Sequence, residues 1–214
     1  MSASESALRE RLCALGRSLF DRGLTAGSSG NLSVRLDDGG WLMTPTNASL
    51  GRLDPARLSR LDAHARLVSG DAPTKEAGLH AAVYASRAAR AVVHLHAHWS
   101  VAASMLADAD PAGVLPALTP YQVMKVGRVP LVPYHRPGDA RAADAVRALA
   151  GAHAAVLLAN HGPIVAGDSL EAAADAVEEL EAAARLHLTL HGRAVRTLTA
   201  DQIDELRRAF GARW

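Results

Sequence analysis

Three histidines, each two residues from the next, occupy the apolar stretch AVVHLHAH at positions 91–98. If this stretch is a strand, His94 and His96 share one face and Leu95 lies on the other, because successive side chains alternate between faces. Two imidazoles on one face can bind one cation, whereas burying them without partners in an apolar strand costs free energy. The spacing therefore predicts a metal site, against the alternative of hydrogen-bonded core histidines.

A catalytic zinc site needs a third protein ligand and an open position for substrate. His98 is one candidate, but it lies about 13 Å from His94 along an extended strand, too far to share one ion. His161 follows the apolar stretch AAVLLAN and precedes a Gly-Pro pair, which places it at a strand end beside a turn. We expect His161 to be the third ligand. The other histidines are interpreted as solvated or structural: His64, His80, His135, His153, His187 and His191.

A carboxylate and a lysine stand at the start of a predicted helix in DAPTKE, residues 71–76. Acidic residues are favoured there by the helix dipole, so a helix-capping role is the alternative to a catalytic one. The exposed amides of a helix start, together with Lys75, also suit a phosphate group. The segments GSSGN (27–31) and TPTN (44–47) can bring amides or hydroxyls to an anion, although such loops are often only turns. Neither has the spacing of a Walker or Rossmann loop.

Helices and strands that alternate along the chain must position these side chains. The periodicity predicts helices over 4–21, 74–88, a segment through 105, 140–149, 169–191 and 201–210, with Thr74 and Asp201 as N-caps of two of them. It predicts strands over 32–36, 41–44, 91–98, 129–132 and 154–159, with a further candidate at 65–68. No repeat or low-complexity linker interrupts them, so one α/β domain over residues 1–214 is the simplest account.

The bulk composition excludes several classes of protein. The chain has 214 residues, is 49% hydrophobic and carries a net charge of +1, and only 4% of its residues are aromatic. These values give no basis for a nucleic-acid partner. A single cysteine, Cys13, excludes an intrachain disulfide. We expect Cys13 to pack beside the stripe of apolar residues on the helix predicted over 4–21. No apolar run reaches the ~18 residues of a membrane span, and the charged N-terminus does not suit a signal peptide, so we expect a cytoplasmic protein without a membrane partner.

The segments GNLSVR, TPT, PTKE, HLH and NHG, in this order, resemble the class II aldolase and adducin-head family over nearly the whole chain. The resemblance implies an α/β fold, a single three-layer αβα domain with a mainly antiparallel central sheet. It also implies a homotetramer with sites between neighbouring subunits. Within each site, His94, His96 and His161 would hold one Zn²⁺ per subunit, and Glu76 would ligate the resting metal and act as acid/base.

The same resemblance implies a phosphate site formed by three loops: Gly30, Asn31, Thr46, Asn47, Thr74 and Lys75. Two of these residues depart from the sugar-phosphate aldolase pattern, which has glycine in place of Asn47 and serine in place of Lys75. The departures indicate that the substrate can differ from a sugar phosphate.

A narrower resemblance comes from residues 115–139, LPALTPYQVMKVGRVPLVPYHRPGD, together with PTKE and EELEAAARL. These segments resemble the 3-oxo-tetronate 4-phosphate decarboxylases, which convert a keto-acid phosphate to dihydroxyacetone phosphate and carbon dioxide. The resemblance makes Tyr121 the proton donor, whereas without it Tyr121 would be a turn aromatic with a solvated hydroxyl. Zinc bound to the keto oxygen would stabilise an enediolate after carbon–carbon cleavage, and Glu76 or Tyr121 would protonate it.

Two alternatives remain open. Aldol cleavage passes through the same enediolate, so a sugar-phosphate aldolase of the fuculose or ribulose 1-phosphate type, or an epimerase, fits the same residues. A non-catalytic adducin-like oligomer module belongs to a different class. Such a module does not require the combination of His94, His96, His161 and Glu76.

Overall fold

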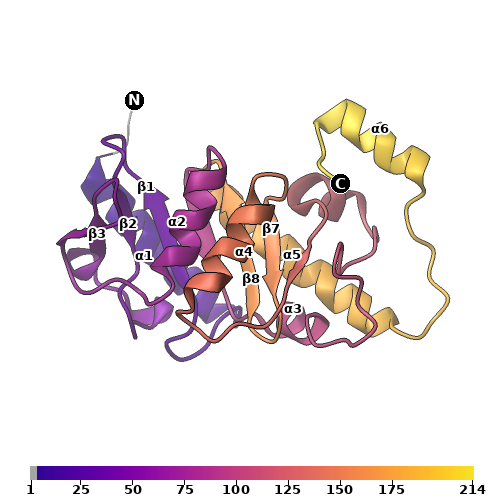
Figure 1. Cartoon of the computed structure of the whole chain (residues 1–214), viewed down its shortest axis with the longest axis horizontal. Helices are drawn as coiled ribbons and strands as arrows, with labels where there is room; N and C mark the ends of the chain where they lie inside the picture. The colour runs from indigo at the N-terminus through magenta and orange to yellow at the C-terminus, as the bar shows by residue number, and fades with distance from the viewer. Residues whose placement is uncertain (1–3) are drawn as a thin grey trace.

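The computed structural model describes residues 4–214. These residues form one eight-stranded sheet with the strand order β4-β3-β2-β1-β5-β8-β7-β6, and helices pack around it (Figure 1). Among the described strands every pairing is antiparallel except that of β6 with β7, as the mainly antiparallel prediction requires. The strands are β1 Asn31–Arg35, β2 Trp41–Met43, β3 Ser59–Leu61, β4 Leu67–Ser69, β5 Ala91–His94, β6 Leu131–Val132, β7 Ala155–Leu158 and β8 Gly162–Gly167.

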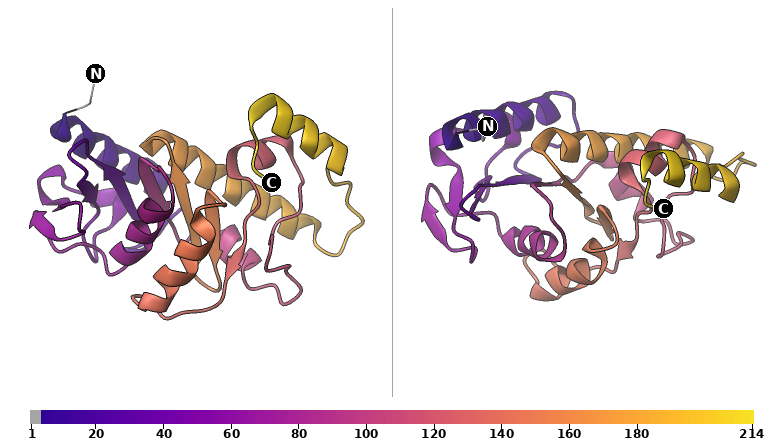
Figure 2. Two further views of the ribbon diagram at one scale, coloured as in Figure 1. Left: turned by 45° about the horizontal axis from the view of Figure 1, so that its top comes forward. Right: turned by 90° about the horizontal axis from the view of Figure 1, so that it is seen from above.

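Helices cover both faces of this sheet and form a three-layer α/β arrangement (Figures 1 and 2). Seen from above, α1 and α5 lie on one side of the sheet, and α2 and α4 on the other (Figure 2). The α-helices are α1 Glu5–Asp21, α2 Ala77–Ser86, α3 His98–Ala103, α4 Ala140–Ala150, α5 Leu170–Leu190 and α6 Ala200–Phe210. The short helices are η1 Leu50–Arg52, η2 Pro55–Arg57 and the π-helix η3 Gln122–Val126. Within residues 4–214, no helix is long and apolar enough to cross a membrane.

The two helical layers bury two separate apolar clusters against the sheet. Strand β5 is buried throughout, and its alternating side chains supply both clusters: Val93 faces α1 and α5, and Val92 faces α2 and α4. On α1 the predicted stripe is present, with Leu12 and Leu19 fully buried. Cys13 packs beside this stripe, and its partial burial raises the pKa of the thiol to about 11, so the thiol stays protonated at neutral pH.

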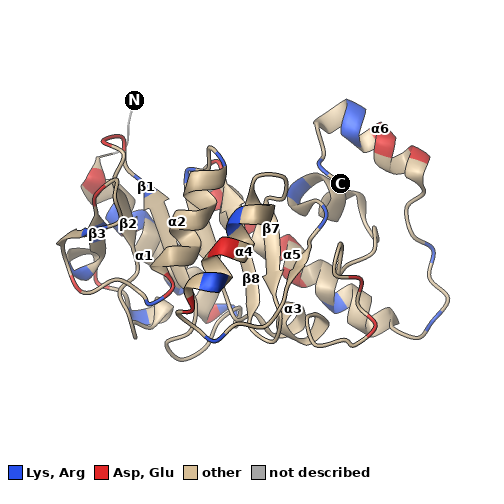
Figure 3. Cartoon of the chain, viewed as in Figure 1, with Lys and Arg blue, Asp and Glu red and all other residues tan. Residues whose placement is uncertain are grey.

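Charged side chains of both signs are interspersed over the outer helices and loops (Figure 3). Several of them join separate elements: Arg22, the C-cap of α1, binds Glu178 of α5 through two hydrogen bonds, and Arg11 binds Glu171 at the start of α5. Exposed pairs of this kind contribute roughly 0–1 kcal/mol each, so they align α1 with α5 rather than hold the fold together.

The C-terminal segment folds back over the loop that carries Tyr121. The amide of Leu198 donates to Ala117 at 2.8 Å, and the amide of Arg128 donates to the carbonyl of Arg213 at 3.3 Å. Helix α6 packs against η3, which begins directly after Tyr121. Residues 198–213 therefore position the segment 117–128.

The strand predicted over 91–98 is shorter than expected. Strand β5 ends at His94, His96 lies in the following loop, and His98 is the first residue of α3. The cause is that both neighbouring strands begin here: β1 starts at Asn31, opposite His94, and β8 starts at Gly162, so little of either strand is left to pair beyond His94. The chain turns away there instead of continuing as a strand.

Two predicted helix starts are also wrong. Helix α2 begins at Ala77 rather than Thr74, and the hydroxyl of Thr74 accepts from the amide of Glu76 at 3.3 Å. The cap of α6 is Thr199, which forms a capping box with Gln202, so Asp201 lies inside the first turn. The remaining predicted elements are present within one to three residues at each end, as expected for element boundaries.

Candidate metal centre and substrate cavity

Four side chains converge at one end of the central strands. The metal-binding atoms of Glu76, His94, His96 and His161 all lie within 4.8 Å of one another. His94 ends β5, and His161 lies between β7 and β8. Because these strands are antiparallel neighbours, the end of β5, the end of β7 and the start of β8 meet at the same sheet edge. His96 follows from the loop after β5, and Glu76 enters from the residue before α2.

The three imidazoles face one another, with ring centroids 4.6–5.1 Å apart. His94 is fully buried, and its Nδ1 lies 2.8 Å from the carbonyl oxygen of Pro163, so Nδ1 carries the proton and Nε2 offers a lone pair. A metal-bound histidine is typically oriented by such a contact of its other ring nitrogen.

Two buried atoms at the centre make no hydrogen bond, Nε2 of His94 and Oε1 of Glu76. Buried polar atoms are rarely left in this state, and an ion would satisfy both. Oε1 lies 3.1 Å from Nε2 of His161, and Nε2 of His161 lies 3.0 Å from Nε2 of His96. Three nitrogens and one carboxylate oxygen form a donor set that suits zinc and other borderline divalent ions. The residues therefore fit a metal ion.

The protonation states agree with this assignment. Burial alone would raise the pKa of Glu76, but His161, His94 and Asn31 around the carboxylate outweigh it and hold that pKa well below its usual range. Burial, followed by the neighbouring His94 and His161, lowers the pKa of His96 to about 4. At neutral pH the centre therefore offers a carboxylate and a neutral imidazole, the forms that bind metals.

The three predicted phosphate loops lie together beside this centre. Residues 45 and 73 form an isolated antiparallel bridge, and the amide of Thr46 donates to Ala72 at 2.9 Å. Gly30 has φ +78°, and a Cβ there would lie 3.0 Å from the carbonyl oxygen of His94, so both the conformation and the space require glycine. Asn47 has φ +58°, a left-handed conformation that asparagine tolerates well. Its departure from the glycine of the sugar-phosphate aldolases therefore preserves the turn.

Asn31 and Thr74, which the sequence assigns to the phosphate site, also contact Glu76. The side-chain amide of Asn31 donates to Oε2 of Glu76 at 2.8 Å and lies 3.4 Å from the hydroxyl of Thr74. Asn31 is only 4% exposed. The backbone of Asn31 lies in the loop beside that of Gly30, whereas its side chain is hydrogen-bonded to the carboxylate of Glu76.

A cavity of about 220 Å³ opens directly onto the centre and is lined by both Glu76 and His161. Its apolar wall comes from α2, α4 and the ends of β6 and β7, and its basic groups are Lys75, His135 and Arg136. A cavity that joins metal ligands, an apolar wall and basic side chains suits a small anionic substrate.

Tyr121 lies in a different part of the fold. It precedes η3, which packs against α5 and α6, and its side chain is 61% exposed. The prediction that it serves a neighbouring subunit's metal concerns contacts outside a single chain and stays a prediction.

Some candidate residues were missed from the sequence. His80 was grouped with solvated or structural histidines, yet it is fully buried and its Nε2 lies 2.6 Å from Oδ1 of Asn31. The available signal was its position four residues after Glu76, because residues four apart share a helix face. The sequence places His135 among the solvated or structural histidines and contains Arg136 only within a family segment, since no spacing relates them to the metal-site histidines.

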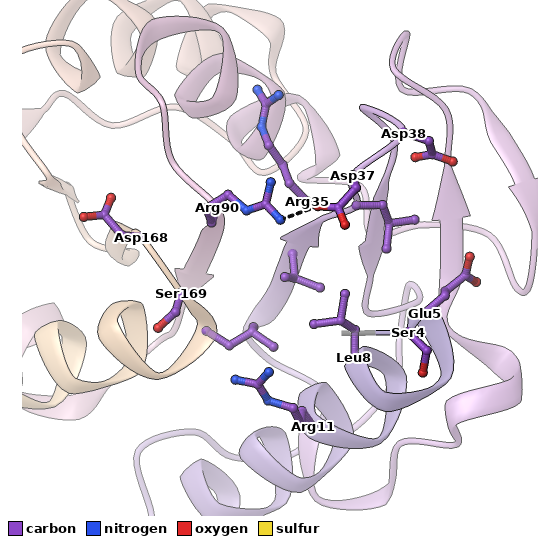
Figure 4. Close-up of a pocket in the computed structure, with 13 residues that line it drawn as sticks. Ser4, Glu5, Leu8, Arg11, Arg35, Asp37, Asp38, Arg90, Asp168 and Ser169 are labelled. Carbon is purple, nitrogen blue, oxygen red and sulfur yellow. Dashed lines mark hydrogen bonds and ion pairs between the residues drawn. The ribbon is translucent and has the colours of Figure 1, made fainter. Parts of the chain in front are cut away.

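A wider cavity of about 560 Å³ lies at the opposite end of β1, β5 and β8 (Figure 4). Arg90 binds Asp37 there at 2.8 Å, and Arg35 donates to the backbone carbonyl of Tyr84 at 2.7 Å. Figure 4 shows charges of both signs around the cavity. Its lining within the described residues includes none of Glu76, His94, His96 and His161, so the smaller cavity is the candidate substrate site.

Comparison with known proteins gives consistent matches. Residues 10–188 match the family described as Class II Aldolase and Adducin N-terminal domain. The 3-oxo-tetronate 4-phosphate decarboxylase of Escherichia coli K12 is 50% identical over 204 residues, 95% of this chain and 96% of that protein. The L-fuculose phosphate aldolase of the same strain is 34% identical over 170 residues, 78% of this chain and 76% of that one. The crystal structure of YgbL from Klebsiella pneumoniae superposes with a TM-score of 0.93 at 50% identity, covering 96% of this chain and all of that one.

Proposed function

The chain belongs to the class II aldolase and adducin N-terminal domain family, and we propose that it is a zinc-dependent lyase that decarboxylates a 3-oxo-tetronate 4-phosphate. The products would be dihydroxyacetone phosphate and carbon dioxide. The observation that carries the proposal is the convergence of three imidazoles and one carboxylate on a small cavity with basic walls. About 50% identity over nearly the whole chain to enzymes named for this reaction supports the choice of substrate.

A zinc ion held by His94, His96 and His161 would supply a Lewis acid for the keto oxygen of the substrate. We propose that three loops bind the phosphate through backbone amides, hydroxyls and a positive charge: Gly30, Asn31, Thr46, Asn47, Thr74 and Lys75. The scissile carboxylate should lie away from positive charge, because an ion pair would stabilise the ground state and slow its loss.

The reaction needs one proton for each turnover. The bond from the carboxylate carbon to its neighbour breaks, carbon dioxide leaves, and the bonding electrons remain on the neighbouring carbon next to the ketone. Tyr121, or Glu76 after it has taken up a proton from water, delivers a proton to that carbon, which completes dihydroxyacetone phosphate. Because carbon dioxide needs no pocket of its own, the 220 Å³ cavity beside Glu76 has to hold only one small substrate.

We further propose a homotetramer in which Tyr121 of one subunit reaches the metal of the next, and in which residues 1–214 act as one domain in the cytoplasm. The continuous sheet from β4 to β6 supports the single domain. The 61% exposure of Tyr121 is compatible with a role across a subunit boundary.

The test is a direct comparison of two substrates with purified, zinc-loaded protein. With a 3-oxo-tetronate 4-phosphate, we expect carbon dioxide and dihydroxyacetone phosphate in equal amounts. Pretreatment with a chelator should abolish both products, and added zinc should restore them. Faster aldehyde release from fuculose 1-phosphate, without carbon dioxide from the keto acid, would replace the proposal with an aldolase. The 34% identity to the L-fuculose phosphate aldolase makes that comparison the necessary one.

A further inference from the structure

A continuous chain of buried hydrogen bonds runs from the interior of the protein to Glu76. The hydroxyls of Tyr84 and Ser33 lie 2.7 Å apart, and the hydroxyl of Ser33 lies 2.7 Å from Nδ1 of His80. Nε2 of His80 lies 2.6 Å from Oδ1 of Asn31, whose Nδ2 donates to Oε2 of Glu76 at 2.8 Å. Ser33 and His80 are fully buried, and the other three side chains are at most 9% exposed.

The direction of every bond in this chain follows from the chemistry of its members. Glu76 is a carboxylate and only accepts, so the Asn31 atom that faces it must be the NH₂ group. Oδ1 of Asn31 then has to accept, and Nε2 of His80 must carry a proton. Burial, followed by the nearby His94, lowers the pKa of His80 to about 3, so its ring is neutral and Nδ1 accepts from Ser33. Ser33 in turn accepts from Tyr84.

The amide of Asn31 could otherwise adopt the opposite orientation. In the flipped state its carbonyl oxygen would face the Glu76 carboxylate at hydrogen-bond distance, and its NH₂ group would face His80. The flip would place the carbonyl oxygen of Asn31 against the carboxylate oxygen of Glu76, and its NH₂ group against the N–H of His80. In a buried site, polar atoms left without a hydrogen-bond partner cost free energy. The carboxylate of Glu76 and the N–H of His80 therefore together hold the orientation in which Asn31 donates to Oε2 and leaves Oε1 directed at His161.

We propose that His80 is a positioning residue for the metal centre: it fixes the side-chain amide of Asn31, which in turn fixes the carboxylate of Glu76 for metal binding and proton transfer. This inference rests on the proposed function only in that Glu76 binds the ion. Indirect partners of this kind typically change metal affinity or activity roughly 10–100-fold when they are removed.

The test uses two polar replacements that differ in reach. In His80→Gln the side-chain NH₂ can occupy the place of Nε2 and donate to Asn31. In His80→Asn the amide is one carbon shorter and reaches only as far as Nδ1. Zinc affinity is measured for the metal-free proteins by competition with a chromophoric chelator, without substrate. We expect a loss of roughly tenfold or more in His80→Asn and near-complete recovery in His80→Gln.

The same pair is then made in the Glu76→Ala background, which removes the contact with Asn31, as a double-mutant cycle. If His80 acts through Glu76, the difference between the Asn and Gln variants should disappear there. Equal zinc affinities of the two variants, or an unchanged difference in the Glu76→Ala background, would overturn the proposal. Tyr84→Phe is the matched control: it removes a buried hydroxyl from the far end of the chain and should alter thermal stability but not zinc affinity.

The metal measurement separates this inference from the proposed reaction. Zinc binding with the expected cycle, but without carbon dioxide release from the keto acid, would reject the decarboxylase and keep the role of His80. Absence of zinc binding by the unmodified protein would reject both.

Discussion

At Glu76 the two oxygens of one carboxylate have different surroundings. Oε2 accepts from Asn31, whereas Oε1 is buried, faces His161 and makes no hydrogen bond. Glu76 occupies the N-cap position of α2, but its side chain makes no capping hydrogen bond. The side chain of Glu76 therefore does not cap α2 through a hydrogen bond, and its contacts within the described residues are with Asn31, His94 and His161.

We predict that Glu76→Gln keeps the fold and loses turnover. Glutamine preserves the volume and the contact with Asn31 but cannot transfer a proton, so kcat should fall by roughly a hundredfold or more. The measurement is steady-state kinetics beside circular dichroism and thermal unfolding. A small change in melting temperature with a nearly intact rate would contradict an acid/base role.

We predict that the protein binds one divalent ion per subunit and that His96→Ala loses most of it, because one of three nitrogen ligands is removed. Metal analysis of the purified proteins measures this. His98→Ala is the matched control, since His98 lies two residues further on, in the first turn of α3, and is not part of the centre. Full occupancy in His96→Ala, or an equal loss in His98→Ala, would reject the assignment of ligands.

We predict that the burial of His80 makes the free energy of unfolding sensitive to acid. Its pKa is about 3 in the folded protein, lowered by burial, against 6.5 in the unfolded chain. Between these values the unfolded state binds more protons, so the free energy of unfolding should decrease as the pH falls below about 6.5, with a limiting slope of ~1.4 kcal/mol per pH unit. Urea unfolding of the metal-free protein at several pH values measures this slope. In His80→Gln the slope should be shallower by this amount, and parallel curves for the two proteins would contradict the argument.

At the scale of elements, three antiparallel strands bring residues that are far apart in sequence to one edge. The apolar stretches that became β5 and β7 were predictable, because they are buried on both faces and contain continuous runs of valine, leucine and alanine. The pairing of His94 and His96 with His161 followed from placing His161 at a strand end. These local patterns were sufficient to predict that the three histidines lie together, although His96 lies in the loop after β5 rather than on the strand.

Strand β8 was not predicted, because Gly162 and Pro163 at its start indicate a turn. Pro163 is tolerated there since its carbonyl, rather than an N–H, serves the neighbouring strand, accepting from Leu95 and from Nδ1 of His94. The contacts of Asn31 with His80 and Glu76 could not be predicted either. They depend on how α2 packs on β1, and no spacing of residues within α2 or within β1 indicates them. Long-range packing of this kind is not encoded in local periodicity.

We predict that Gly162→Ala destabilises the protein by roughly 2 kcal/mol or more and weakens metal binding. Gly162 has φ +145°, and an added Cβ would lie 2.2 Å from the carbonyl oxygen of Leu95, between the segments that carry His94, His96 and His161. Gly192→Ala is the control for backbone conformation alone, because Gly192 has φ +75° and no atom within 4 Å of the added Cβ. Urea unfolding and zinc titration of both variants measure the difference, and equal effects would contradict a packing role for Gly162.

For the whole molecule, the separation of Tyr121 from the metal ligands leads to a prediction about assembly. Tyr121→Phe and His94→Ala should each be inactive, the first for lack of a proton donor and the second for lack of metal. If one site uses the metal of one subunit and the tyrosine of another, mixed tetramers should regain activity in roughly a quarter of their sites.

The two inactive proteins are unfolded together, refolded as a mixture and assayed, with hybrid tetramers verified by distinct tags. The two variants refolded separately and then combined serve as controls and should stay inactive. No recovery in verified hybrids would place the whole reaction within single subunits.

The return of residues 198–213 over the Tyr121 loop has a consequence for the order in which the protein matures. All four metal-binding residues lie before position 162, and α5, which packs on β5 and β8, ends at Leu190. The loop at 117–128 gains its hydrogen bonds to residues 198 and 213 only after those residues leave the ribosome. During synthesis, the residues that build the metal centre and its supporting helix therefore precede those that hold the Tyr121 loop in place.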